Sequence, residues 1–187
     1  DCFAPYPEGF KTIKANDYEA IKTAFDDTTA AFFVECIQGE GGVNLLDPAW
    51  IQAASDAARA AGAIVMADEV QTGIGRTGTF LASDFLDFKP EVVTLAKGIA
   101  GGLPMGACLF RGKAADVFVA GDHQSTFAGN PLVCAAATVV LETVADREFL
   151  DRGNHVGDYI RSAISSWNLP IVKGVRGRGL MIGTQID

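Results

Sequence analysis

The chain has 187 residues, with 15 Lys and Arg against 23 Asp and Glu, which gives a formal net charge of −8. This balance argues against a protein that binds nucleic acid or an anionic membrane, because such a protein would carry a basic patch or tail. Apolar residues make up 49% of the chain, which is enough for a buried core and argues against wholesale disorder.

The first third of the chain alternates short apolar runs with helical patterns. A short helix is predicted over 17–26, and a buried strand over 30–34 that ends in the glycine-rich loop 39–42. Asp47-Pro48 predicts the start of a helix, because Asp is a good N-cap and Pro suits the first helical position. Gly62 predicts the end of that helix.

The rest of the chain continues the alternation. The predicted elements are strands over 63–67, 92–95 and 106–110, a helix from Asn130 to about residue 145, an amphipathic helix carrying residues 156–167, and an apolar terminal strand at 180–183. Continuous apolar strands between helices indicate an α/β fold, with a mostly parallel sheet and helices on both faces. Residues 1–146 are assigned to this domain, and residues 147–187 to a linker helix and the start of a smaller C-terminal domain.

The cysteines and the chain end add two expectations. Cys2, Cys36, Cys108 and Cys134 are scattered and form no C-x-x-C pair, so a zinc site or a disulfide framework is disfavoured. Free, mostly buried thiols indicate a cytoplasmic protein, and no metal is predicted. Because the terminal strand stops at Asp187 without a continuation, the sequence is interpreted as part of a longer protein.

The 21 glycines are clustered, and one cluster forms a motif. Gly73–Gly78 matches G-x-G-x-x-G, which in a Rossmann domain follows a strand directly and opens a helix. Here the strand ends several residues earlier, and residues 79–84 make a weak helix start. The pattern therefore favours an ordinary loop, with a dinucleotide-binding domain kept as a distant alternative.

Two polar residues at strand ends carry the chemical argument. Asp68 ends a buried strand, where a structural ion pair or helix cap is as good an interpretation as function; its neighbour Glu69 points to the opposite side of the strand. Lys97 follows another buried strand and has small, apolar flanks, which predict partial desolvation of the amine. A desolvated lysine is a nucleophile for carbonyls, and a lysine paired with a carboxylate is the usual arrangement for pyridoxal phosphate.

Four motifs then occur in order, and together they resemble one family. They are Glu35–Gly42 (ECIQGEGG), Asp68–Gly73 (DEVQTG), Leu95–Gly98 (LAKG) and Ser125–Pro131 (STFAGNP). This series is similar to the class III, ornithine-type, pyridoxal-phosphate aminotransferases over nearly the whole chain. The resemblance implies the large domain of fold type I and the cofactor pyridoxal 5′-phosphate. It also implies amino transfer from N-acetylornithine, or a similar ω-amine, to 2-oxoglutarate in arginine biosynthesis.

The resemblance also implies roles for the residues around the cofactor. Lys97 matches the lysine that bonds to the cofactor aldehyde and then carries the proton, and Asp68 matches the partner of the pyridine nitrogen. Val70 matches the residue packed on one ring face, and Gln71 the donor near the phenolic oxygen. Glu69 completes the predicted cofactor-binding set.

Other matched residues concern substrate and assembly. Thr126 matches a threonine that binds the cofactor phosphate of the neighbouring subunit, which implies a homodimer, and Ser125 would lie near the substrate. Glu40 matches a glutamate that pairs with an arginine and gates which substrate group enters. The sequence departs from the family at Cys36, where proline is usual, and at Ala128, where glycine is usual.

Several alternatives stay open at this level. The enzyme could act on ornithine, 4-aminobutyrate or a diaminopelargonate precursor, or be an aminomutase with the same cofactor; a non-catalytic remnant is also possible. The family's phosphate-binding turn and substrate-binding arginines have no match in these residues. Residues 1–187 alone are therefore predicted to be inactive or nearly so.

Overall fold

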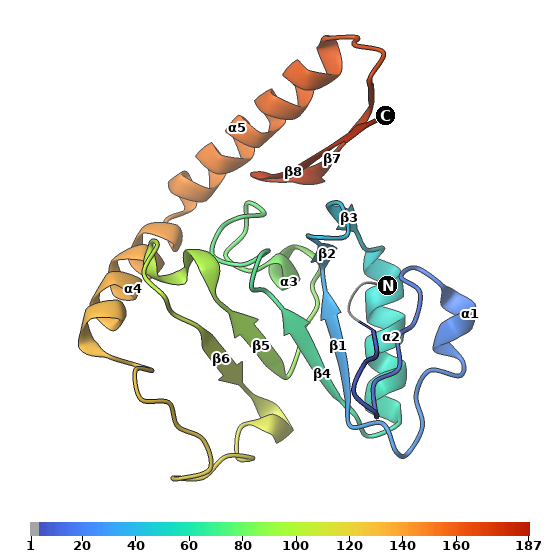
Figure 1. Ribbon diagram of the computed structural model, residues 1–187, viewed down its shortest axis with the longest axis vertical. Helices are drawn as coiled ribbons and strands as arrows, with labels where there is room; N and C mark the ends of the chain where they lie inside the picture. The colour runs from blue at the N-terminus through green and yellow to red at the C-terminus, as the bar shows by residue number, and fades with distance from the viewer. Residues whose placement is uncertain (1–3) are drawn as a thin grey trace.

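The computed structural model describes residues 4–187 and has a four-stranded sheet at its centre (Figure 1). The strands, in their spatial order, are β1 (Ala31–Glu35), β4 (Ile64–Asp68), β5 (Val92–Leu95) and β6 (Ala107–Phe110). β1, β4 and β5 run parallel, and β6 is antiparallel to β5. The predicted α/β fold, with a mainly parallel sheet flanked by helices, is confirmed.

Helix α2 (Pro48–Ala60) packs on the sheet and forms the core with it. The Asp47 side chain accepts a hydrogen bond from Ala49 N–H at 3.0 Å, and Pro48 occupies the first helical position, as the sequence predicts. The apolar face of the helix is fully covered by the sheet. Its buried residues are Trp50, Ile51, Ala54, Ser55 and Ala58.

Two long helices follow the sheet. α4 (Pro131–Val144) has Asn130 as its N-cap, and α5 (Arg147–Ser166) has Asp146. α4 contacts the 3-10 turn that follows β5, and α5 contacts the terminal hairpin described below (Figure 1). The boundary expected at 146/147 falls between the two helices and remains a prediction.

Only the first turn of the helix predicted over 17–26 forms. α1 spans Tyr18–Ile21, with the Asp17 side chain accepting from two backbone N–H groups. The segment then turns, because the Asp26 carboxylate accepts from the backbone and the hydroxyl of Thr28 and holds a local turn instead. The other short helical elements are α3 (Ala82–Phe85), η1 (Lys97–Ala100) and η2 (Gly112–Ala114).

Two antiparallel hairpins are not predicted from the sequence. β2 (Ile37–Gln38) pairs with β3 (Asn44–Leu45), and β7 (Val172–Arg178) pairs with β8 (Met181–Ile186). β2 and β3 are too short to show a period, and β7 alternates Gly with charged residues, so neither has an apolar run. The strand predicted at 180–183 forms as part of β8 and pairs with β7.

The β7–β8 hairpin rests on the Gly73–Gly78 loop. Leu180 N–H donates to Arg76 C=O at 2.9 Å. A Cβ on Gly179 would lie 2.4 Å from the carbonyl carbon of Thr77, so the two backbones touch directly. The motif glycines themselves pack closely against protein: a Cβ on Gly73 would lie 2.8 Å from Glu69 O, one on Gly75 2.9 Å from Val144 Cγ1, and one on Gly78 1.7 Å from Asn154 Oδ1. Turns and then α3 follow the motif, rather than the long helix that a dinucleotide fingerprint opens.

The cysteine side chains differ in how far they are buried. Cys36 is buried, Cys134 half-buried and Cys108 exposed, so the expectation of mostly buried thiols is only partly right; Cys2 lies outside the described residues.

Within residues 4–187, no helix is both long and apolar enough to cross a membrane. In the same range, no group of three or more His, Cys, Asp or Glu side chains could hold a metal ion.

Candidate active site

Polar residues lie side by side at the carboxyl ends of the parallel strands. Glu35 at the end of β1 pairs with Asp68 at the end of β4, and Asp68 pairs with Thr94 of β5. Lys97 follows β5 at the same edge of the sheet. This is the edge at which open α/β sheets bind their ligands.

One oxygen of the Asp68 carboxylate is held by the protein. Oδ1 accepts from Val70 N–H at 2.9 Å and from Thr94 Oγ1 at 3.4 Å. Oδ2 accepts no hydrogen bond from any of residues 4–187, and the residue is half-buried. Asp68 is therefore oriented by one oxygen while the other stays available to a donor from a ligand.

Glu69 lies on the other side of the strand end and is fully buried. Its carboxylate accepts from Ala82 N–H at 3.0 Å, from Ser83 N–H at 2.7 Å and from the Thr72 hydroxyl. These bonds fix the start of α3. Glu69 thus has a structural role at α3; neither Glu69 nor Asp68 is among the residues that line the cavity described next, and the cofactor-binding role of Glu69 stays a prediction.

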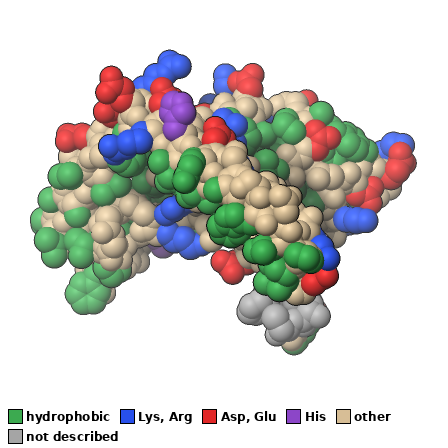
Figure 2. Space-filling model, turned by 90° about the horizontal axis from the view of Figure 1, so that it is seen from above, with side chains coloured by type: hydrophobic (Ala, Val, Ile, Leu, Met, Phe, Trp, Pro, Cys, Tyr) green, Lys and Arg blue, Asp and Glu red, His purple; other side chains and the backbone are tan. Residues whose placement is uncertain are grey.

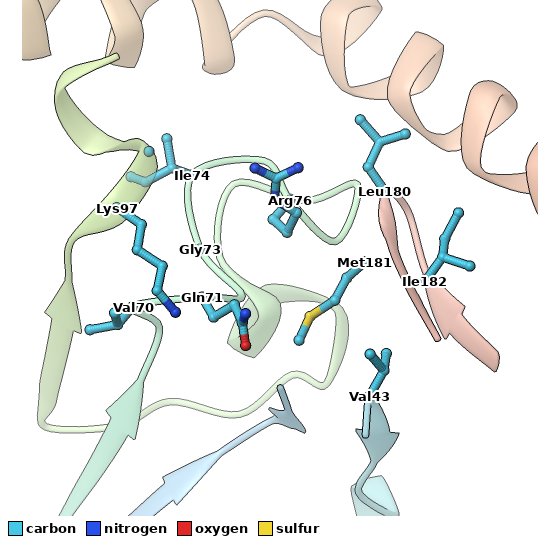
Figure 3. Close-up of a pocket in the computed structure, with 11 residues that line it drawn as sticks. Val43, Val70, Gln71, Gly73, Ile74, Arg76, Lys97, Leu180, Met181 and Ile182 are labelled. Atoms are coloured by element: carbon cyan, nitrogen blue, oxygen red, sulfur yellow. The ribbon is translucent and has the colours of Figure 1, made fainter. Parts of the chain in front are cut away.

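A cavity of about 300 Å³ lies between this sheet edge and the β7–β8 hairpin (Figure 3). Lys97 extends from η1 toward Val70 and Gln71, and Arg76 lies above them; the hairpin forms the opposite wall. The lining residues are Val43, Val70, Gln71, Gly73, Ile74, Arg76, Lys97, Gly98, Leu180, Met181 and Ile182. One wall thus carries amine, amide and guanidinium groups, and the other is apolar.

Lys97 is exposed at this cavity, so the desolvation predicted from its apolar flanks is not found. The reason is the backbone: Lys97 has φ +48°, which turns its side chain away from the buried face that Ile99 and Ala100 occupy. Among residues 4–187, the Lys97 amine has no hydrogen-bond or ion-pair partner. The amine is therefore open to a ligand.

Backbone strain is concentrated around the cavity. Val43, Ile74 and Lys97 all line it and have φ between +48° and +56°. The left-handed region is a genuine outlier for β-branched residues such as Val and Ile, and costs on the order of 1–3 kcal/mol per residue. Strain of this kind persists at functional sites where the surroundings fix the backbone.

Not all predicted site residues come together. Glu40 is exposed and accepts a hydrogen bond from Nε2 of the cavity-lining Gln71 at 3.5 Å, so Glu40 stands beside the cavity. Ser125 and Thr126 are exposed in the segment between β6 and α4, which Figure 1 shows away from the upper end of the sheet. Within one chain, therefore, they do not reach the cavity.

Sequence reasoning missed Arg76 and the hairpin wall. Arg76 belongs to the G-x-G-x-x-G stretch, which had been interpreted as an ordinary loop. A cation between Gly75 and Gly78 in a loop after a strand could have drawn attention to it. Leu180, Met181 and Ile182 gave a strand signal only, with nothing to indicate which surface they would face.

The departure at Cys36 has no reactive consequence. The side chain is 1% exposed, and burial together with the nearby Glu69 charge raises the pKa of the thiol well above its usual range. Such a thiol stays protonated and behaves as a small apolar side chain.

The match to a known family fits this geometry. The profile of the family described as aminotransferase class-III matches residues 3–187. The chain belongs to this family, whose members are transaminases that use pyridoxal 5′-phosphate. The distant alternative, a dinucleotide-binding domain, is thereby wrong.

Particular relatives share most of the chain. The chain is 46% identical over 186 residues to acetylornithine aminotransferase of Haemophilus ducreyi, covering 99% of this chain and 47% of that protein. It is 45% identical over 181 residues to acetylornithine aminotransferase of Mycobacterium bovis, covering 97% and 45%. The chain thus spans about half the length of the curated relatives it matches.

Solved structures agree in fold. Ornithine aminotransferase of Toxoplasma gondii matches with a TM-score of 0.91 and 38% identity, covering 99% of this chain and 45% of that chain. N-acetylornithine aminotransferase of Stenotrophomonas maltophilia matches with a TM-score of 0.87 and 34% identity, covering 97% and 48%. Another T. gondii ornithine aminotransferase structure is described with PLP at partial occupancy in its active site.

The residues present fit this cofactor. The Lys97 amine is open to an aldehyde, and Asp68 Oδ2 is available to a ring N–H at the adjoining strand end. Gln71 presents an amide, and Val70 an apolar surface, to the same cavity. The donor set thus matches an anionic aromatic aldehyde.

Proposed function

We propose that the protein containing this chain is an aminotransferase that moves an amino group from N-acetylornithine, or a similar ω-amine, to 2-oxoglutarate. The observation that carries the proposal is the partner-free Lys97 amine that opens into the cavity at the sheet edge where Asp68 stands. The names of the relatives support the substrate and a place in arginine biosynthesis. We propose a cytoplasmic location.

Pyridoxal 5′-phosphate, when bound, supplies an aldehyde and an electron-accepting ring. Lys97 Nζ is the group we assign to bind the aldehyde carbon and then to hold and move a proton beside the substrate carbon. Asp68 Oδ2 would accept from the protonated ring nitrogen, and its negative charge would keep that proton in place. Val70 would provide an apolar surface for the ring, and Gln71 would supply a donor for its phenolic oxygen.

Glu40 and Ser125 are the proposed substrate residues, and Glu40 is the one at the cavity. Its carboxylate stands beside Gln71, where it attracts the cationic group of an amine donor and repels a second carboxylate on an oxo acid. The position of the Glu40 carboxylate therefore affects whether the amine donor or the oxo acid enters the cavity.

A homodimer is proposed to bring Thr126 and Ser125 to the neighbouring cavity. Hydrophobic side chains gather at one end of the molecule in Figure 2, the side where Figure 1 shows α4 and the segment after β6. Exposed residues of this region are Val117, Phe118, Val119, Phe127, Leu132 and Val139, with Phe127 81% exposed beside Thr126. Apolar patches of this kind support an interface with another protein surface.

The test uses the full-length protein and the substitution Lys97→Ala. We expect the visible absorbance of the bound cofactor to disappear and amino transfer to fall by at least about 10³-fold, since both need the amine. Lys89→Ala, which removes an exposed lysine paired only with Asp87, is the control and should keep both signals. A full-length protein without a visible band that binds a nicotinamide cofactor instead would overturn the proposal.

A panel of donors then separates the alternatives. Half-reactions with N-acetylornithine, ornithine, 4-aminobutyrate and a diaminopelargonate donor are followed by the change in cofactor absorbance. We expect the largest kcat/KM with N-acetylornithine. Isomerisation of an amino acid without any oxo-acid requirement would indicate an aminomutase.

A further inference from the structure

The turn 39–43, which joins β2 to β3 and carries Glu40, is held on one side by the sheet edge. Gly39 N–H donates to Glu35 Oε2 at 2.9 Å. Gly39 also lies directly against Gln71, since a Cβ there would be 1.4 Å from Gln71 Oε1. The first residue of the turn is therefore fixed, and Glu40 follows it next to the cavity.

The other side of the turn is held by the β7–β8 hairpin, which faces the tip of β2–β3 in Figure 1. Arg176 Nε donates to Gly42 C=O at 2.6 Å, and Arg176 Nη1 donates to Gln185 Oε1 at 3.3 Å on the paired strand. A Cβ on Gly42 would lie 2.9 Å from Arg176 Nη2. The guanidinium is thus anchored on the hairpin and reaches a residue 134 positions away.

The backbone of the turn needs such a contact. Gly42 has φ +108° and Val43 φ +56°, which for a β-branched residue is a strained conformation. Val43 also packs on β8, where a Cβ on Gly183 would lie 2.9 Å from Val43 Cβ. Strained backbone persists only where its surroundings over-determine it, and here the surroundings are Arg176 and Gly183.

We infer that Arg176 is a positioning residue that sets where the Glu40 carboxylate stands at the cavity, and so how well the amine donor competes with the oxo acid. The inference rests on the proposed gating role of Glu40. Without the bond from Arg176, the turn relaxes away from the hairpin and Glu40 leaves the cavity mouth. The ammonium group of the amine donor then loses an attractive charge, and the second carboxylate of the oxo acid loses a repulsive one.

The test compares Arg176→Gln with Arg161→Gln in the full-length holoenzyme. Arg161 holds the same hairpin from the α5 side, with Nη1 donating to Gly179 C=O at 2.9 Å, but it does not contact the turn 39–43. Both half-reactions are measured separately through the cofactor absorbance, and the unfolding midpoint is recorded. For Arg176→Gln we expect kcat/KM with the amine donor to fall about tenfold, through KM, and kcat/KM with the oxo acid not to fall, because Glu40 repels its second carboxylate.

The control should lower the unfolding midpoint by a similar amount without changing the ratio of the two half-reactions. Arg176→Lys, which keeps the charge and one donor, should recover part of the donor KM. If the ratio of kcat/KM for the two half-reactions is the same in Arg176→Gln and Arg161→Gln, the inference is overturned, because a merely structural role would affect both variants alike.

Glu40→Gln and the double variant separate this inference from the proposed function. In the Glu40→Gln background, Arg176→Gln should cause little further loss of kcat/KM with the amine donor, because Arg176 acts through Glu40. A full additional tenfold loss there overturns the role of Arg176 and leaves the proposed function intact. If Glu40→Gln itself leaves the ratio unchanged, the gating role fails, and with it this inference. Absence of both half-reactions with every donor contradicts the proposed aminotransferase.

Discussion

The two walls of the cavity differ in chemistry and in how they are held. The sheet edge presents Gln71 and Lys97 from the segments that directly follow the parallel strands β4 and β5, beside Asp68 at the end of β4. The hairpin wall presents only apolar side chains and is held by a few contacts with the Gly73–Gly78 loop, the turn 39–43 and α5. The reactive groups thus lie on the rigid sheet edge, while the shape of the cavity depends on the β7–β8 hairpin, which is held by few contacts.

The largest expected effect concerns the sheet edge. Asp68→Asn keeps an oxygen for Val70 N–H but removes the charge, so kcat for amino transfer should fall by about 10²- to 10³-fold with little loss of stability. The measurement is single-turnover transfer in the full-length protein at saturating donor.

The neighbouring Glu69→Gln variant is the matched control for Asp68→Asn. Gln keeps only one acceptor oxygen for the three groups that Glu69 binds, so the free energy of unfolding should fall by about 1–2 kcal/mol. Its kcat should stay near the parent value. A loss of kcat in Glu69→Gln equal to that in Asp68→Asn would contradict the division of roles between the two carboxylates.

The next effect concerns the hairpin wall. Gly179→Ala places a Cβ 2.4 Å from the Thr77 carbonyl carbon at φ +54°, so the hairpin must shift and the free energy of unfolding should fall by about 2–3 kcal/mol. The donor KM should rise, while the visible cofactor band stays, because Lys97 is untouched. Gly174→Ala, in strand β7 of the same hairpin and with open space around it, should change neither the free energy of unfolding nor the donor KM. Loss of the cofactor band in Gly179→Ala would show that the two walls are not separable.

The smallest effect concerns the amino end of the same sheet, where Glu91 links β4 and β5. Burial disfavours the ionised carboxylate, but hydrogen bonds from Arg59 Nε and Val65 N–H, both 2.9 Å, outweigh it and hold the pKa of Glu91 below its usual value. A depressed acid pKa stabilises the fold above the unfolded value of about 4.3, and the contribution disappears as pH falls through the lower folded value.

Glu91→Gln should therefore lower the free energy of unfolding by about 1 kcal/mol at neutral pH and flatten its fall below about pH 4. Denaturant titrations at several pH values measure both. Glu19→Gln, which breaks an exposed pair with Lys22, should cost less than about 0.5 kcal/mol. Activity should be unchanged in both variants, and a drop in kcat for Glu91→Gln would contradict the separation between the two ends of the sheet.

Much of the sheet and its caps could be predicted because their signals are local. The strand at 92–95 and the helix starts at Asp47 and Asn130 appear where the sequence predicts them, since apolar runs and cap residues act within one or two turns. The helix over 17–26 was predicted too long, because hydrogen bonds of Asp26 compete with it. β7 was missed because its residues become a strand only when β8 pairs with them.

The sequence by itself determined the family, the mostly parallel α/β sheet and the two residues, Asp68 and Lys97, that follow the ends of neighbouring strands. These follow from motifs and from the rule that parallel strands end at the same edge. Only the tertiary structure decided that Glu69 binds the start of α3, that Arg76 and the hairpin complete the cavity, and that Ser125 and Thr126 lie away from the cavity of their own chain. Such placements depend on contacts between distant segments, such as Arg176 with Gly42, and no local pattern encodes which surfaces will meet.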